Sequence, residues 1–70
     1  MVKTKKYFGE DHIVCTTQAE IDLYQGPKVR LWIDTPGDAL VSECLSCYVK
    51  AGGSAEIVKA GEWAFRIDEG

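Results

Sequence analysis

The feature that most constrains the fold of this chain is the alternation of apolar and polar residues in two neighbouring segments. In 19–24, and again in 29–34, every second residue is apolar, and Gln25-Gly26-Pro27-Lys28 lies between the two runs. A period of two residues is typical of a β-strand with one buried face, and glycine next to proline is typical of a turn. The two segments therefore predict a β-hairpin.

Further strands are predicted on both sides of this hairpin. The segment 12–17 is rich in β-branched residues, which favour strands. The segments 54–59 and 63–68 flank a short turn that contains Gly61. These two segments predict a second hairpin at the C-terminal end of the chain.

One helix is predicted between the two hairpins. Thr35 suits the N-cap, Pro36 suits the first helical position, and Asp38 takes the place of the acidic residue of a capping box. From 39 to 50 the apolar residues recur at helical spacing, and the glycine pair at 52–53 supplies a stop. We therefore expect a helix over 39–50.

These elements predict an α+β fold. The fold would be a small antiparallel sheet, with the order β-β-β-α-β-β along the chain and one helix packed on one face. The 70 residues are expected to form a single domain, with 1–6 as a mobile arm and with no internal repeat. Besides the helix stripe, the expected inward-facing residues are Ile21, Leu23, Val29, Leu31, Ile33, Ile57, Phe65 and Ile67.

The charge of the chain disfavours nucleic-acid binding. Eleven acidic residues against eight basic ones give a formal net charge of −3, and the basic residues cluster only at Lys3, Lys5 and Lys6. Nucleic-acid-binding proteins gain much of their affinity from neutralising phosphates. No apolar run has the length of a membrane span, and the N-terminus lacks the apolar region of a signal peptide. We therefore expect a cytoplasmic protein without a nucleic-acid or membrane partner.

The cysteines and the single histidine suggest two kinds of chemistry. Cys44 and Cys47 form a Cys-x-x-Cys pair, but redox pairs gain their reactivity at a helix N-terminus, and this pair would lie inside the predicted helix. With His12 and Cys15, the same pair has the ligand count of a Cys₃His zinc site. If 12–17 is a strand, however, His12 and Cys15 face opposite sides of it. We therefore expect buried, structural cysteines and no cofactor.

No catalytic motif is apparent in the sequence. Cys15 and His12 could serve as a nucleophile and its base, but no third orienting group or oxyanion hole accompanies them. The chain also has no phosphate-binding loop and no metalloprotease motif. We therefore expect that the protein is not an enzyme.

A set of turn, cap and strand residues between 34 and 67 carries a family resemblance. The set comprises Asp34-Thr35-Pro36-Gly37-Asp38-Ala39, Cys47, Gly53-x-x-Glu56 and Gly61-x-Trp63-x-Phe65-x-Ile67. In this order the residues resemble the C-terminal half of SirA/TusA-type sulfur carriers. The resemblance implies a strand, a helix and two further strands. The Cys-Pro-x-Pro motif of that family is absent, because Thr16 follows Cys15. The alternative function is a sulfur-carrier, redox or zinc-binding protein that uses Cys15, Cys44 and Cys47.

The outward face of the predicted central hairpin offers a contact surface. Tryptophan, tyrosine and arginine are enriched among residues that dominate the energy of protein interfaces. We therefore predict a small, acidic, non-catalytic module that binds another protein as a regulator or inhibitor, with a homodimer as a second option. Small acidic modules of this kind are common among phage and mobile-element proteins. The predicted partner-binding residues are Glu20, Asp22, Tyr24, Arg30 and Trp32.

Overall fold

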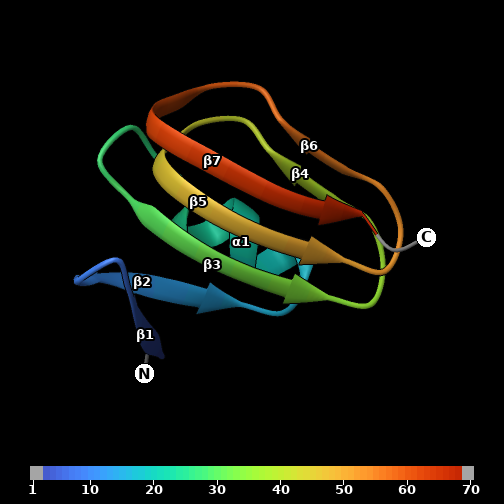
Figure 1. Cartoon of the computed structure of the whole chain (residues 1–70). Coiled ribbons are helices and arrows are strands. Elements are labelled where there is room, and N and C mark those ends of the chain that lie inside the picture. Colours follow the sequence, from blue (N-terminus) through green and yellow to red (C-terminus); the bar gives the residue numbers. More distant parts are fainter. Residues whose placement is uncertain (1–2, 69–70) are drawn as a thin grey trace.

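The computed structural model describes residues 3–68, which form one helix and two β-sheets. The larger sheet has the order β1-β2-β3-β5-β7, and the smaller sheet pairs β4 with β6. β1 and β2 are antiparallel, whereas every other pair is parallel. Figure 1 shows α1 and the smaller sheet behind β3, β5 and β7. The elements are β1 (Thr4–Tyr7), β2 (Glu10–Cys15), α1 (Gln18–Tyr24), β3 (Arg30–Thr35), β4 (Ala39–Val41), β5 (Cys44–Ala51), β6 (Ala55–Ile57) and β7 (Ala60–Asp68).

From β3 onward the chain winds as a short parallel solenoid. It passes from the larger sheet to the smaller one at β4, returns at β5, crosses again at β6 and returns at β7. Leu31 pairs with Cys47, and Ala39 pairs with Ala55, so one coil takes 16 residues in both sheets. The repeat is one of strand position rather than of residue identity, so it is not visible as an internal repeat in the sequence.

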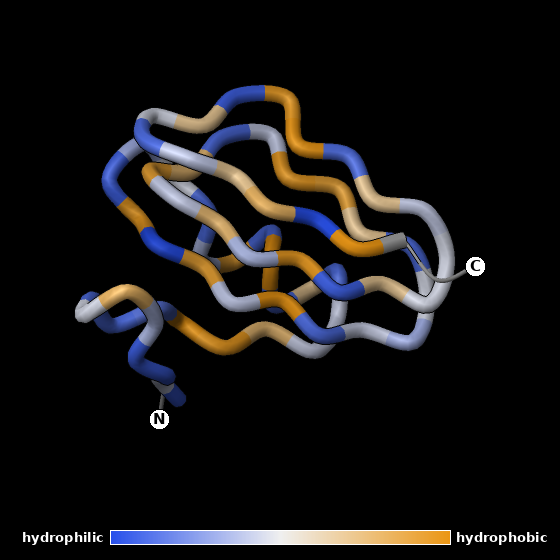
Figure 2. The backbone as a smooth tube through the Cα atoms, in the orientation of Figure 1, coloured by the Kyte–Doolittle hydropathy of each residue, from blue (hydrophilic) through white to orange (hydrophobic). Residues whose placement is uncertain are grey.

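The predicted helix over 39–50 is wrong. Its residues form β4 and β5, which lie in different sheets. Cys47, Val49 and Ala51 are buried at every second position, and Figure 2 shows the alternation of hydropathy along β5. The apparent helical spacing arose because the apolar residues of two short strands are separated by a turn. The strand–helix order implied by the resemblance to sulfur carriers is wrong for the same reason.

The larger sheet is mostly parallel, so the predicted antiparallel arrangement is also wrong. The segments 54–59 and 63–68 do contain β6 and β7, but these strands belong to different sheets and form no hairpin. The coarser prediction of one helix with a multi-stranded sheet is confirmed. Phe65, expected to face inward, is 50% exposed on the outer face of β7.

The segment 19–24 forms the helix α1 instead of a strand. The side chain of Thr17 caps this helix by accepting a hydrogen bond from the backbone N–H of Glu20 at 3.2 Å. The Glu20 carboxylate in turn accepts hydrogen bonds from the backbone N–H and the hydroxyl of Thr16, both at 2.8 Å. The Thr-x-x-Glu pattern is the sequence signal of a capping box. In this segment the helix that it favours forms in place of the strand that the short alternation of apolar residues predicted. Only Ile21 of the helix is buried, and Leu23 is 73% exposed.

The helix closes one edge of the smaller sheet. The side-chain amide of Gln18 donates to the carbonyl of Leu40 and accepts from its N–H, both at 2.8 Å. The amide of Gln25 accepts from the backbone N–H of Ser42 at 2.7 Å. Gln18 thus supplies β4, and Gln25 the residue that follows it, with the hydrogen bonds that a neighbouring strand would otherwise make.

The core lies between the two sheets and under α1. Its residues are small or branched, which lets the two layers approach closely. The buried apolar residues are Cys15, Ile21, Leu31, Ile33, Ala39, Val41, Cys44, Cys47, Val49, Ala51 and Ala55.

The turns of successive coils stack tightly at one end of the solenoid. The N–H of Gly52 donates to the carbonyl of Thr35 at 2.9 Å, and the N–H of Gly53 donates to that of Gly37 at 3.0 Å. A side chain at Gly52 would collide with the backbone of Pro36. The glycine pair is therefore needed for this close approach and does not end a helix.

The N-terminal segment takes part in the larger sheet. Residues 4–7 form β1, although 1–6 was expected to be a mobile arm, while Met1 and Val2 lie outside the described residues. Among residues 3–68, no helix has the length and hydropathy needed to cross a membrane.

Candidate functional site

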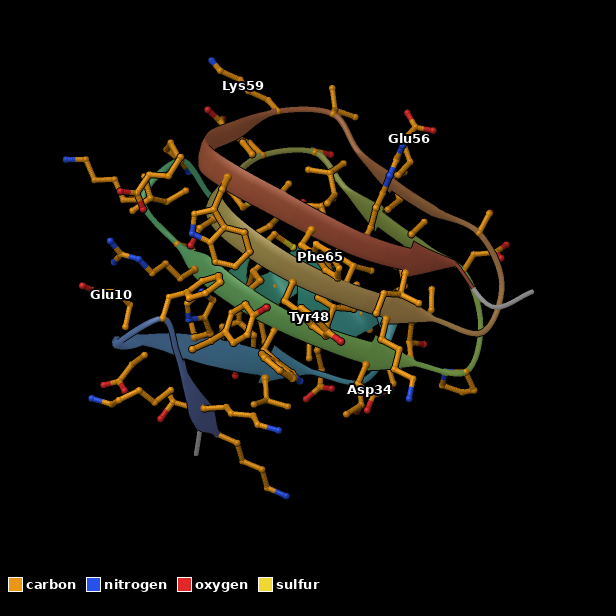
Figure 3. All side chains as sticks on the ribbon, in the orientation of Figure 1. Glu10, Asp34, Tyr48, Glu56, Lys59 and Phe65 are labelled. Atoms are coloured by element: carbon orange, nitrogen blue, oxygen red, sulfur yellow. The ribbon has the colours of Figure 1, made fainter. Side chains whose placement is uncertain are left out.

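The outer face of the larger sheet carries a ladder of aromatic rings. Trp32, Tyr48 and Phe65 occupy matching positions on β3, β5 and β7. The Trp32 and Tyr48 ring centroids are 4.2 Å apart with planes at 17°, and those of Tyr48 and Phe65 are 5.6 Å apart with planes at 13°. Figure 3 shows Tyr48 and Phe65 side by side on this face. Parallel strands in register place equivalent side chains next to one another, which produces the stack.

The β1–β2 hairpin adds further rings to the ladder. The Tyr7 ring lies 4.9 Å from that of Trp32 and 5.5 Å from that of Trp63. Phe8 lies 5.4 Å from Trp63 and is 76% exposed. We call the resulting surface the aromatic face; its members are Tyr7, Phe8, Trp32, Tyr48, Trp63 and Phe65.

The turn that presents Phe8 is strained. Phe8 and Gly9 connect β1 to β2 as a two-residue loop, and both have positive φ, 53° and 79°. This conformation matches the hairpin turn that favours asparagine or aspartate followed by glycine. A bulky aromatic residue at positive φ is rare because its Cβ crowds the backbone. The chain thus holds an exposed ring where local energetics disfavour one.

A buried histidine–serine pair lies beneath these rings. Nδ1–H of His12 donates to the carbonyl of Glu10 at 2.9 Å, which leaves Nε2 to accept from the Ser46 hydroxyl at 3.3 Å. Both side chains are buried, with the rings of Tyr7 and Trp63 within 6 Å of the imidazole, at 5.8 and 5.7 Å. Because both ring nitrogens have partners, the pair satisfies its own polar groups and supports the aromatic face from below.

Charged side chains border the aromatic face. Arg30 lies 3.3 Å from Glu62 of β7 and 3.8 Å from Glu10 of β2, so it links the strands on either side of β3 and β5. The ammonium of Lys5 lies 4.4 Å from the centroid of the Trp32 ring. The Lys5 side chain thus lies along the Trp32 ring, and Phe8 stays exposed.

The structure separates the five predicted partner-binding residues into two groups. Arg30 and Trp32 lie on the outer face of the larger sheet, whereas Glu20, Asp22 and Tyr24 lie on α1 in the other layer. The three helical residues have local structural roles. Hydrogen bonds from Thr16 lower the pKa of Glu20, Asp22 accepts from Gln18 at 3.0 Å, and Tyr24 packs against the core.

Sequence reasoning missed most of the aromatic face. The residues it did not select are Tyr7, Phe8, Tyr48, Trp63 and Phe65. The signal for Tyr48 and Phe65 was the recurrence of an aromatic residue at 32, 48 and 65, which becomes visible only once a coil length of about 16 residues is known.

The three thiols lie on the opposite side of the larger sheet, within the core. Burial, followed by the charge of Glu20, raises the pKa of Cys15 to about 11. The Cys47 thiol donates to Cys44, which lowers the pKa of Cys44 and raises that of Cys47. His12 faces the other way, so the Cys₃His set is not brought together. Within the described residues, no group of three His, Cys, Asp or Glu side chains is placed to hold a metal ion.

The comparison with known proteins identifies no relative of this chain. No family model, no curated protein sequence and no solved structure matches it.

Proposed function

We propose that this protein is a non-catalytic module that binds another protein through the aromatic face, as a regulator or inhibitor would. The observation that carries the proposal is the strained, 76%-exposed ring of Phe8 at the edge of a cluster of five other aromatic residues. Backbone strain that the surrounding structure maintains is concentrated at functional positions. An exposed ring at such a position is better explained by contact with a partner than by folding.

The composition of the face supports a protein partner with an apolar contact surface. Aromatic residues and arginine dominate the energetics of protein interfaces, and large apolar patches on a protein surface commonly mark such sites. The rings of Trp32, Tyr48 and Phe65 stand upright and stack on one another. Their edges therefore meet an incoming surface, while their flat sides are largely engaged with each other. This geometry favours side chains inserted between Phe8 and the ladder over a flat ligand laid across it.

A matched pair of substitutions tests the proposal. Phe8→Asn removes the ring at a position where asparagine is favoured by the turn, so the fold is kept. Leu23→Asn removes an apolar side chain of nearly equal exposure, 73% against 76%, on the helix of the other layer. Each variant and the wild-type chain would be immobilised and exposed to lysate of the native host, with captured proteins quantified by mass spectrometry and the identified partner then titrated.

Phe8→Asn is expected to weaken the affinity for that partner about 30-fold or more, since loss of an aromatic residue that dominates an interface typically costs about 2 kcal/mol. Leu23→Asn should leave the affinity within about threefold of the wild-type value. Circular dichroism would verify that both variants are folded. If the same proteins bind with equal strength to all three chains, the aromatic face is not the contact surface.

A further inference from the structure

The strand β1 is attached to the rest of the fold with little buried surface. It is the outermost strand of the larger sheet and pairs with β2 alone (Figure 1). Thr4, Lys5 and Lys6 are exposed. The fourth residue of the strand, Tyr7, is half-buried. A short strand of this kind belongs to the part of a protein that opens locally while the rest stays folded.

The ring of Tyr7 holds β1 against the sheet. It lies 4.9 Å from the ring of Trp32, 5.3 Å from that of Tyr48 and 5.5 Å from that of Trp63, which belong to β3, β5 and β7. The ammonium of Lys5 also contacts the Trp32 ring, but an exposed cation–π contact stabilises only weakly. Tyr7 therefore provides most of the attachment of β1 to the strands beyond β2.

The turn between β1 and β2 opposes this attachment. Phe8 has a φ of 53°, in the left-handed region that a bulky side chain rarely adopts. When β1 separates from β2, the turn can leave this conformation, so its strain is released. The closed hairpin thus combines one half-buried anchor with a strained connection.

The buried His12–Ser46 pair lies beneath β1. His12 is opposite Lys5 in the register of β1 and β2, and the Tyr7 ring lies 5.8 Å from the imidazole. His12 is 1% exposed, and its Nε2 accepts from the Ser46 hydroxyl at 3.3 Å. Movement of β1 away from the sheet removes both Lys5 and Tyr7 from this place, and solutes can then reach the imidazole.

We infer that β1 is a strap that opens and closes over the His12–Ser46 pair, with Tyr7 as the residue that holds it closed. In the open state the chain from β2 to β7 stays folded and the imidazole is accessible. Opening also removes Tyr7 and Phe8 from the aromatic face, so this face is complete only while the strap is closed. The motion is a property of the isolated chain and does not depend on the proposed partner binding.

Chemical modification of His12 measures the opening, because His12 is the only histidine of the chain. Diethyl pyrocarbonate modifies an accessible imidazole, and peptide mass spectrometry over time gives the rate at this residue. Tyr7→Ala is expected to raise the rate at least about tenfold, since the loss of several ring contacts favours the open state. Phe65→Ala is the matched control, because it removes a ring of the same face that stacks on Tyr48. This variant should stay within about threefold of the wild-type rate, since the opening is local.

A reversible tether tests the same motion without removal of Tyr7. Lys6 and Asp11 are opposite each other on β1 and β2, with Nζ 3.5 Å from the carboxylate oxygen. The double variant Lys6→Cys, Asp11→Cys can therefore join the two strands by a disulfide. The oxidised double variant is expected to react at His12 at least about tenfold more slowly than its reduced form. The reduced form should react like the wild-type chain.

The outcomes separate strap opening from global unfolding. Circular dichroism verifies that each variant is folded, and if Tyr7→Ala fails to fold, the two forms of the double variant decide alone. Equal rates for the oxidised and reduced forms would overturn the inference. So would a folded Tyr7→Ala variant that reacts like the wild-type chain. Rates raised equally by Tyr7→Ala and Phe65→Ala would also overturn it, because His12 is then reached by unfolding of the whole chain.

Discussion

The ring of Tyr48 stacks on that of Trp32, with their centroids 4.2 Å apart and their planes inclined by 17°. The two residues are one coil apart in the sequence and meet because β3 and β5 are parallel and in register. The outer face of the larger sheet is thus a stabilising element in its own right, opposite the core.

The central position of Tyr48 in the ladder predicts a stability effect. Tyr48→Ala removes the contacts with both Trp32 and Phe65, and we expect the free energy of unfolding to fall by about 2–3 kcal/mol. Tyr48→Phe keeps the ring, and its effect should stay within about 0.5 kcal/mol. Urea denaturation gives the free energies, and near-ultraviolet circular dichroism reports the loss of ring coupling. Equal stability of the alanine and phenylalanine variants would show that the stack contributes nothing.

The stacked turns predict opposite outcomes for two glycines. Gly52→Ala forces a methyl group against the backbone of Pro36, and we expect a loss of about 2 kcal/mol or more in the free energy of unfolding. At Gly37 an added methyl group meets no atom within 4 Å. Gly37→Ala is therefore expected to be neutral or to stabilise by up to about 1 kcal/mol. Thermal denaturation of both variants checks the pair, and similar losses at both positions would contradict the tight stacking of the coils.

Burial of Cys15 predicts a pH dependence of stability. The folded chain raises the pKa of this thiol from 9.0 to about 11, so the folded state holds the proton more tightly than the unfolded state. The resulting stabilisation is complete below pH 9 and is lost as the pH rises towards 11, by up to about 1.4 kcal/mol per pH unit. Cys15→Ala should flatten this part of the dependence, whereas the contributions of Cys44 and Cys47 remain in both proteins. Denaturation series between pH 8 and 11 would measure the difference, and identical slopes for the two proteins would refute the assignment.

The strands of the larger sheet were accessible to sequence reasoning because alternation is a local property. β3 matches the predicted strand 29–34 to within one residue at each end, and β7 contains the predicted strand 63–68. Within these strands Leu31 and Ile33 face the core as expected. The position of the helix could also have been predicted from the sequence, since Thr17 and Glu20 form the Thr-x-x-Glu pattern of a capping box immediately before Ile21.

The pairing of the strands was not accessible in the same way. Nothing local distinguishes β4 and β5 from a helix whose apolar residues recur every three or four positions, because the turn between them shifts the phase of the alternation. The same holds for the candidate site. The alternation of apolar and polar residues in 29–34 placed Trp32 on an outward face. Tyr7 and Trp63 lie near Trp32 only because distant segments of the chain pair with one another.

The sequence by itself determined which residues alternate, where turns interrupt them and that the cysteines are best explained as core residues. The tertiary structure decided that most strands run parallel, that successive coils repeat every 16 or 17 residues and that the aromatic rings form one face. The physical reason is that alternation fixes only which side of a strand is buried. The neighbour of each strand, and with it the set of residues that share a surface, depends on hydrogen bonds and packing between segments far apart in the chain.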